Sequence, residues 1–132
     1  MVGALARVNN NFQKLSPLAK SVASELNFKP PVYNPYHMNT AQLIETAHCF
    51  EESIKLLSEL LKKGLKDEKP NVKPKAGTGV GAVEVPRGIL YHEYTYDSEG
   101  ILVNANCVIP TGQKHANIAL DMKKLVPEII DK

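Results

Sequence analysis

Hydrophobic residues recur at alternating spacings of four and three along residues 39–65, which predicts a long amphipathic helix. Asn39 is positioned to cap this helix, and Lys62 and Lys63 before Gly64 suit its carboxyl end. The apolar stripe is wide, so other helices are needed to cover it, and without them it becomes an exposed apolar face. The stripe consists of Leu43, Ala47, Phe50, Ile54, Leu57 and Leu61.

Shorter helices are predicted on both sides of the long one. Ser16 and Pro17 are typical of an N-cap and a first helical position, and they predict a helix over residues 17–26. Its apolar positions recur at a spacing of four, at Leu18, Val22 and Leu26. Residues 29–37 contain three prolines and form a connector. Apolar residues from 117 to 130 predict a last helix, which Pro127 breaks or restarts.

The second half of the chain begins with a basic segment and continues with strands. Residues 66–81 are rich in Lys, Pro and Gly without apolar periodicity, which predicts a linker or loop. Residues 88–96 and 101–109 are β-branched and aromatic, and the turn sequence Asp97-Ser98-Glu99-Gly100 separates them. We therefore predict an antiparallel β-hairpin.

The predicted fold class is α+β, with a long amphipathic helix and shorter helices plus an antiparallel β-hairpin. The predicted organisation is a helical part over residues 1–65, the linker over 66–81, and the hairpin with a carboxyl-terminal helix over 82–132. Together these parts are expected to form one incomplete domain, because the long helix lacks enough neighbours to bury its apolar stripe.

Composition narrows the function classes. The 132 residues include 16 Lys and Arg against 14 Asp and Glu, and a net charge of +2 does not favour nucleic acid or a membrane as partner. No long apolar run or secretory signal is found, so we expect a soluble, cytoplasmic protein. The two cysteines, Cys49 and Cys107, lie 58 positions apart and the four histidines are scattered. We therefore predict no metal site and no cofactor held by this chain alone.

Two glycine-containing segments are candidates for chemistry. Residues 77–82 match the G-x-G-x-x-A spacing of dinucleotide sites but lack the flanking strand and helix, so a flexible loop is favoured. In Glu84-Val85-Pro86-Arg87-Gly88, a proline fixes the backbone before an arginine, which can aim the guanidinium at an anionic or polar ligand. The alternative is an ion pair between Arg87 and Glu84.

Two further side chains qualify as candidates near the predicted hairpin. Thr111, after Pro110, offers a hydroxyl at the end of the second strand that can donate beside Arg87; the alternative is an ordinary strand-ending turn. His92 lies on the strand face opposite Glu93, where a hydrogen-bonded structural role is favoured over catalysis.

The segment from Gly79 to His92, the acidic turn and Val108-Ile109-Pro110-Thr111 resemble, in order and spacing, the large subunit of nickel-iron hydrogenases. Residues 2–7 (VGALAR) are similar to the V-G-P-L-A-R stretch of that family, and His48-Cys49-Phe50-Glu51-Glu52 is similar to part of its long central helix. The resemblance covers essentially the whole chain. It extends to the cytoplasmic, methyl-viologen-reducing enzymes of methanogens, which feed an electron-transfer complex.

The resemblance implies roles for individual residues. Arg87 would overhang the open face of the nickel-iron centre as the catalytic residue, and Thr111 would hydrogen-bond an iron-bound cyanide. Pro86 and Pro110 would line the pocket. Supporting positions would be taken by Glu84 and His92. This sequence departs from the family pattern at Val85, where alanine is usual, at Ala4, where proline is usual, and at Lys114, where an amide is common.

The family binds its metals through four cysteines, in R-x-C-G-x-C and D-P-C-x-x-C motifs, and these 132 residues contain neither motif. Neither Cys49 nor Cys107 occupies a ligand position. The expected function is therefore that of a central large-subunit segment, an oxidoreductase part that is inactive alone. Its expected partners are an iron-sulfur small subunit and the remaining parts of the large one.

Two other hypotheses remain open. The first is a non-enzymatic interaction module derived from such a subunit, in which the long helix binds a partner. The second is an independent acid-base enzyme using Glu84, Arg87 and His92, which ranks last because no nucleophile is paired with a base. The first hypothesis and the hydrogenase assignment both predict self-association of the isolated chain through the apolar stripe.

Overall fold

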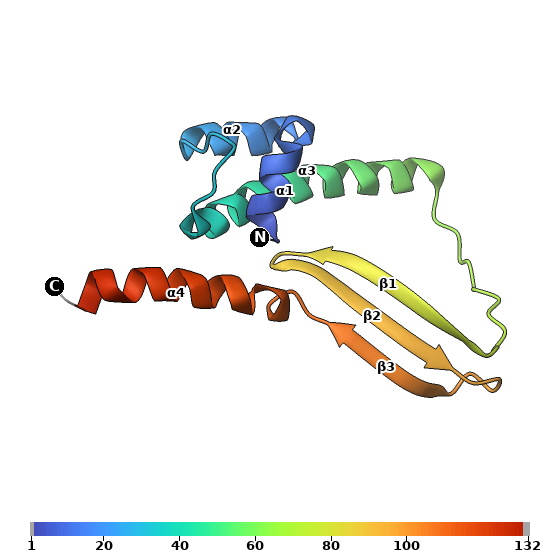
Figure 1. The fold of residues 1–132 in the computed structure, drawn as a ribbon. Coiled ribbons are helices and arrows are strands. Elements are labelled where there is room, and N and C mark those ends of the chain that lie inside the picture. The colour runs from blue at the N-terminus through green and yellow to red at the C-terminus, as the bar shows by residue number, and fades with distance from the viewer. Residues whose placement is uncertain (1, 131–132) are drawn as a thin grey trace. The chain divides into compact units, whose positions relative to one another are not determined.

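The computed structural model describes residues 2–130, and the chain divides into two compact units. The helical unit comprises residues 4–73, and the sheet unit joins Val2 and Gly3 to the segment from Pro74 onward. Within the described residues the elements are four α-helices and a three-stranded antiparallel sheet (Figure 1). This confirms the predicted α+β fold class.

The helical unit contains α1 (Ala4–Asn11), α2 (Pro17–Glu25) and α3 (Met38–Lys63), with short 3-10 helices at Phe12–Lys14 and Pro35–His37. The predictions for α2 and α3 are confirmed with their ends within two residues. The sequence analysis predicted no helix at α1.

The core of the helical unit depends on small side chains. Ala19 and Ala23, one turn apart on α2, and Ala41 on α3 are fully buried, which lets the helix backbones approach closely. The prediction that Leu18 and Leu26 face inward is wrong, since they are 48% and 42% exposed. The complete core consists of Ala4, Leu5, Val8, Leu15, Ala19, Ala23, Phe28, Ala41 and Ile44.

The amino end of α2 is capped by side chains of α3. The backbone N–H of Ser16 donates to Nδ1 of His48 at 3.2 Å, and that of Leu18 donates to Oε2 of Glu51 at 2.8 Å. Ser16 occupies the predicted N-cap position, but its hydroxyl makes no capping hydrogen bond. For α3 the cap prediction is wrong, because its N-cap is His37 and Asn39 lies inside the helix.

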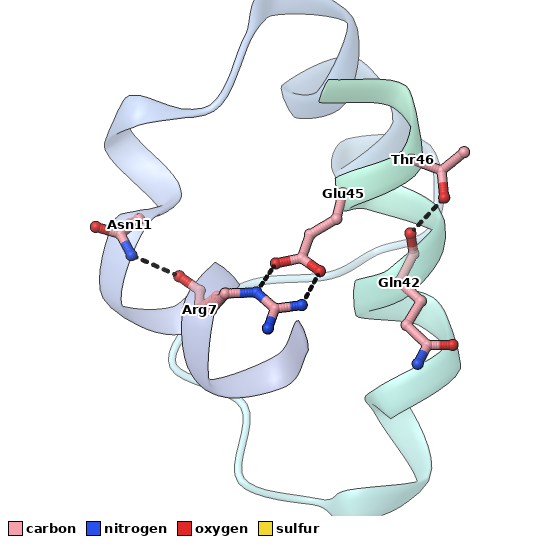
Figure 2. Close-up of polar contacts among 5 residues, drawn as sticks. All are labelled: Arg7, Asn11, Gln42, Glu45 and Thr46. Carbon is pink, nitrogen blue, oxygen red and sulfur yellow. Dashed lines mark hydrogen bonds and ion pairs between the residues drawn. The ribbon is translucent and has the colours of Figure 1, made fainter. Parts of the chain in front are cut away.

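A two-pronged ion pair joins α1 to α3 (Figure 2). Nε and Nη2 of Arg7 each donate to a carboxylate oxygen of Glu45 at 2.7 Å, and the two side chains are 17% and 19% exposed. Charge-assisted bonds of this geometry are stronger than bonds between neutral groups, and partial burial limits screening by salt. This pair fixes the register between the two helices.

The second half of α3 has no cover in the part of the chain described. Every residue from Ser53 to Lys63 is exposed, and Phe50 and Leu61 are 65% and 73% exposed. The predicted stripe therefore does not form the core, which uses Ala41 and Ile44 instead. The exposed apolar face that the sequence predicted is confirmed.

The sheet contains β1 (Gly77–Val85), β2 (Gly88–Tyr96) and β3 (Leu102–Val108) in that order. The predicted hairpin is confirmed as β2 and β3. The assignment of residues 77–81 to a loop is wrong, because they form the first half of β1. Glycines at alternate positions place Gly77, Gly79 and Gly81 opposite Tyr96, Tyr94 and His92, so small residues face the rings across the strand pair.

The predicted turn between β2 and β3 is confirmed, with Oδ1 of Asp97 accepting from the backbone N–H groups of Glu99 and Ile101, both at 2.9 Å. The last helix, α4, spans His115–Ile130 without the predicted break, since Pro127 lies inside it. None of its described residues is buried. Across residues 2–130 no helix has both the length and the apolar character that crossing a bilayer requires.

Candidate functional site

The two segments singled out by the sequence lie at one end of the sheet. Pro86 and Arg87 form the tight turn between β1 and β2, whose flanking residues Val85 and Gly88 are paired. Pro110 and Thr111 follow the end of β3, shortly after Val108, which pairs with Tyr91. The start of β2 and the end of β3 meet at the same edge because the strands are antiparallel.

Gly88 and Pro110 hold these segments together. Both residues are buried, and a Cβ atom at Gly88 would lie 3.1 Å from Cβ of Pro110 and 3.5 Å from Cγ2 of Val2. The absence of a side chain at Gly88 therefore lets Pro110 pack against the strand backbone. Arg87 and Thr111 are the chain neighbours of this contact, so the structure brings the two candidate segments together.

The amino-terminal segment completes the same end of the sheet unit. Gly3 has a φ of +106°, and a Cβ atom there would lie 2.9 Å from the carbonyl oxygen of Arg87 and 3.0 Å from Nζ of Lys114. Glycine satisfies both requirements at once, a positive φ and close backbone approach. Sequence reasoning missed this position, and the only signal was a glycine near the amino terminus.

Gln113 ties the segment after β3 to the sheet. Its Nε2 donates to the backbone carbonyl of Ile89 at 2.8 Å, while the backbone N–H of Lys114 donates to the carbonyl of Thr111 at 3.0 Å. These bonds position Thr111 in a turn anchored to β2. The predicted strand-ending turn is thus present, and it leaves the Thr111 residue exposed.

Arg87 is exposed and forms no ion pair with Glu84 among the described residues, so the predicted alternative of a local salt bridge is wrong. An arginine side chain carries its charge at all physiological pH values and presents five donors in a planar fork. At this end of the sheet the fork and the hydroxyl of Thr111 are both accessible. The arrangement can bind an anionic or polar group.

Glu84 and His92 cannot work together. In the pairing of β1 with β2, Glu84 is opposite Ile89 while His92 is opposite Gly81, so the two side chains project from opposite faces of the sheet. This separation excludes the hypothesis of an acid-base site built from Glu84, Arg87 and His92. The structure places Glu84 beside the Arg87 turn and His92 further along β2.

His92 instead belongs to a cluster on one face of the sheet. Its Nδ1 lies 2.6 Å from Oη of Tyr94 and 3.4 Å from Sγ of Cys107. Desolvation raises the pKa of the Tyr94 phenol above 10.0, and the charge and hydrogen bond of the neighbouring Cys107 raise it further. Sequence reasoning missed this cluster, because it depends on the strand register that puts His92 opposite Cys107.

Within residues 2–130 no group of three or more His, Cys, Asp and Glu side chains is arranged to hold a metal ion. The two cysteines lie in different units, Cys49 on α3 and Cys107 on β3. The site at the end of the sheet therefore offers hydrogen-bond donors and positive charge, and the described residues around it supply no set of metal ligands.

No family model matches the chain. It is 38% identical over 114 residues to the vhu-type F420-non-reducing hydrogenase polypeptide of Methanococcus voltae, covering 83% of this chain and 26% of that protein. It is 31% identical over 137 residues to an iron-sulfur subunit of the F420-non-reducing hydrogenase of Archaeoglobus profundus, covering 99% and 27%. Similarity to the alpha subunit of sulfhydrogenase 2 of Pyrococcus furiosus is 33% over 114 residues, covering 83% and 26%. The chain spans about a quarter of the length of these relatives, and the resemblance to hydrogenase subunits is confirmed.

Proposed function

We propose that this chain acts as the central part of the large subunit of a nickel-iron hydrogenase and supplies residues that lie over its metal centre. The observation that carries the proposal is the meeting of the Arg87 turn and the Pro110-Thr111 segment at one end of the sheet, through the contact of Gly88 with Pro110. Similarity to polypeptides of F420-non-reducing hydrogenases supports the same assignment.

The chemistry of the donors fits a covering role. When bound, a nickel-iron centre supplies the activation of hydrogen, and its anionic ligands need fixed positive charge and hydrogen-bond donors around them. Pro86 restricts the backbone before Arg87, and the turn anchored by Gln113 positions Thr111. Donors held in place by such supports stabilise charge without reorganising.

These residues cover a metal centre but do not hold it. The family resemblance requires four cysteine ligands, and these 132 residues contain two cysteines, neither at a ligand position. The ligands must therefore come from other parts of the large subunit. We propose as partners these other parts and an iron-sulfur small subunit, with the exposed half of α3 as one surface that they cover.

The test is co-expression of the chain with polypeptides that carry the two missing cysteine motifs and with the small subunit. We expect hydrogen uptake with methyl viologen as acceptor, and a loss of about a hundredfold or more in Arg87→Ala, because a preorganised charge is removed. Arg87→Lys should retain part of the rate, and Lys75→Ala, an exposed cation before β1, should retain all of it. Full activity in Arg87→Ala would contradict the proposed role of the guanidinium.

A second candidate function is a non-enzymatic interaction module, which the exposed half of α3 also favours. The two functions differ in metal content. A complex of the chain with the missing parts should contain nickel in about a one-to-one ratio if the hydrogenase function is correct. A stable complex without nickel would favour the interaction module.

A further inference from the structure

His92, Tyr94 and Cys107 converge on one point of the sheet. His92 and Cys107 are direct partners in the register of β2 with β3, and their Nδ1 and Sγ atoms lie 3.4 Å apart. Cys107 is exposed and His92 is half-buried, so both ligand atoms are accessible from solvent. An imidazole nitrogen and a thiol sulfur in this relation form a pair that can chelate.

The distance between the two atoms matches coordination of one cation. With zinc–sulfur and zinc–nitrogen bonds of about 2.3 and 2.1 Å, tetrahedral coordination separates sulfur from nitrogen by about 3.6 Å. The observed separation of 3.4 Å needs only a small side-chain movement. Oη of Tyr94, at 2.6 Å from Nδ1, is closer than the about 3.4 Å expected between an oxygen and a nitrogen ligand. Tyr94 is therefore assigned as a hydrogen-bond partner rather than as a ligand.

The neighbouring strand leaves room for the rest of a coordination sphere. Gly81 and Gly79 are opposite His92 and Tyr94, and a Cβ atom built at either glycine meets nothing within 4 Å. On the other side, Ala105 is opposite Tyr94. Small residues on both flanks leave space for water or another small ligand beside the cation.

We propose that Cys107 and His92 form a binding site for a thiophilic divalent cation such as Zn²⁺ or Cd²⁺. Sulfur and imidazole ligands together favour this class over Mg²⁺ and Ca²⁺, which prefer oxygen. On binding, the thiol gives its proton to solvent, the thiolate and the imidazole nitrogen each donate an electron pair, and water completes the coordination. The Tyr94 hydroxyl then gives up its contact with Nδ1. The site requires no part of the proposed hydrogenase function.

The experiment is a titration of the full chain with Cd²⁺ and with Co²⁺ under reducing conditions. We expect one ion per chain, a thiolate-to-metal charge-transfer band and release of a proton measured in weakly buffered solution. X-ray absorption on the Zn²⁺-loaded chain should find one sulfur and at least one nitrogen at the metal. This last measurement needs no variant, so a folding defect cannot obscure it.

Variants with matched controls test the assignment of the ligands. Cys107→Ser should abolish the charge-transfer band and His92→Gln should weaken binding at least about tenfold, as loss of a ligand does. Cys49→Ser and His115→Gln, at exposed positions on helices, should leave both unchanged. Tyr94→Phe should retain binding. The proposal is overturned if the chain binds no cation, if Cys49→Ser removes the band, or if His92→Gln has no effect.

Discussion

A single hydrogen on the α-carbon of Gly3 decides how closely the amino-terminal segment approaches the Arg87 turn. A Cβ atom there would come within 2.9 Å of a backbone oxygen, which cannot move as a flexible side chain can. We predict that Gly3→Ala lowers the free energy of unfolding by about 1–3 kcal/mol, through a positive φ together with a steric clash. Urea denaturation followed by circular dichroism measures the change.

Gly64→Ala is the matched control for this prediction. Gly64 also has a positive φ, of +78°, but a Cβ atom there meets nothing within 4 Å. Its substitution should therefore report the cost of the backbone conformation alone, which is about 1 kcal/mol. Equal losses in the two variants would show that the contact with Arg87 contributes nothing.

Tyr94 makes stability depend on alkaline pH. Its pKa is raised above 10.0 in the folded chain by desolvation and by the neighbouring Cys107, so the folded state holds the phenol proton more tightly than the unfolded state. The contribution to stability is complete below the unfolded pKa and is lost as the pH rises through the folded pKa. We predict that Tyr94→Phe flattens the decline in stability above pH 10.0.

The measurement is denaturant unfolding at a series of pH values, together with ultraviolet titration of tyrosinate. Tyr33→Phe is the control, because this side chain is 77% exposed and has no ring or hydrogen-bond partner in residues 2–130. Its substitution should leave the pH dependence of stability as it is. A Tyr94→Phe curve that parallels the wild type would contradict the prediction.

At the residue scale, the sequence identified the donors but not their supports. Arg87 and Thr111 could be proposed because their chemistry and their neighbouring prolines are visible in the chain. The roles of Gly3 and Gln113 depend on contacts between segments far apart in the sequence. No local pattern encodes such contacts, so these residues could be found only in the folded chain.

At the element scale, α2 depends on α3 for its amino-terminal cap. We predict that Glu51→Ala lowers the stability of the chain by about 1 kcal/mol, because the backbone N–H of Leu18 loses its acceptor. Glu59→Ala is the control, since this exposed residue lies further along the same helix. Thermal unfolding by circular dichroism should separate the two variants, and indistinguishable midpoints would contradict the prediction.

Elements were predicted well wherever a local period was strong. The 3.6-residue pattern located α3, and the β-branched and aromatic runs located β2 and β3. β1 was missed because glycines at alternate positions imitate a flexible loop. Their role is visible only from the pairing of Gly77, Gly79 and Gly81 with the ring-bearing face of β2. The tertiary partner, and not the local propensity, makes this segment a strand.

At the scale of the whole molecule, the chain cannot bury the apolar surface that its own sequence specifies. The core of the helical unit ends near Ala47, while α3 continues to Lys63 with every residue from Ser53 onward exposed. α4 in the sheet unit likewise has no buried residue among those described. The sequence predicted this incompleteness from the shortage of long helices, and it predicts that the missing cover must come from another polypeptide.

In the absence of other polypeptides, a second copy of the chain is the available cover. We predict that the isolated chain self-associates through α3, where Ile54, Leu57 and Leu61 are 64%, 60% and 73% exposed, because burying this stripe removes apolar surface from water. Sedimentation velocity over a concentration series should show a rising average mass, and a hydrophobic dye should bind. Replacing Leu57 and Leu61 with glutamate should shift the chain toward monomer, whereas Ser58→Glu, on the same turn but outside the stripe, should not. A monomer at every concentration without dye binding would show that the exposed face has no affinity for itself, and the stripe would then require a partner of different sequence.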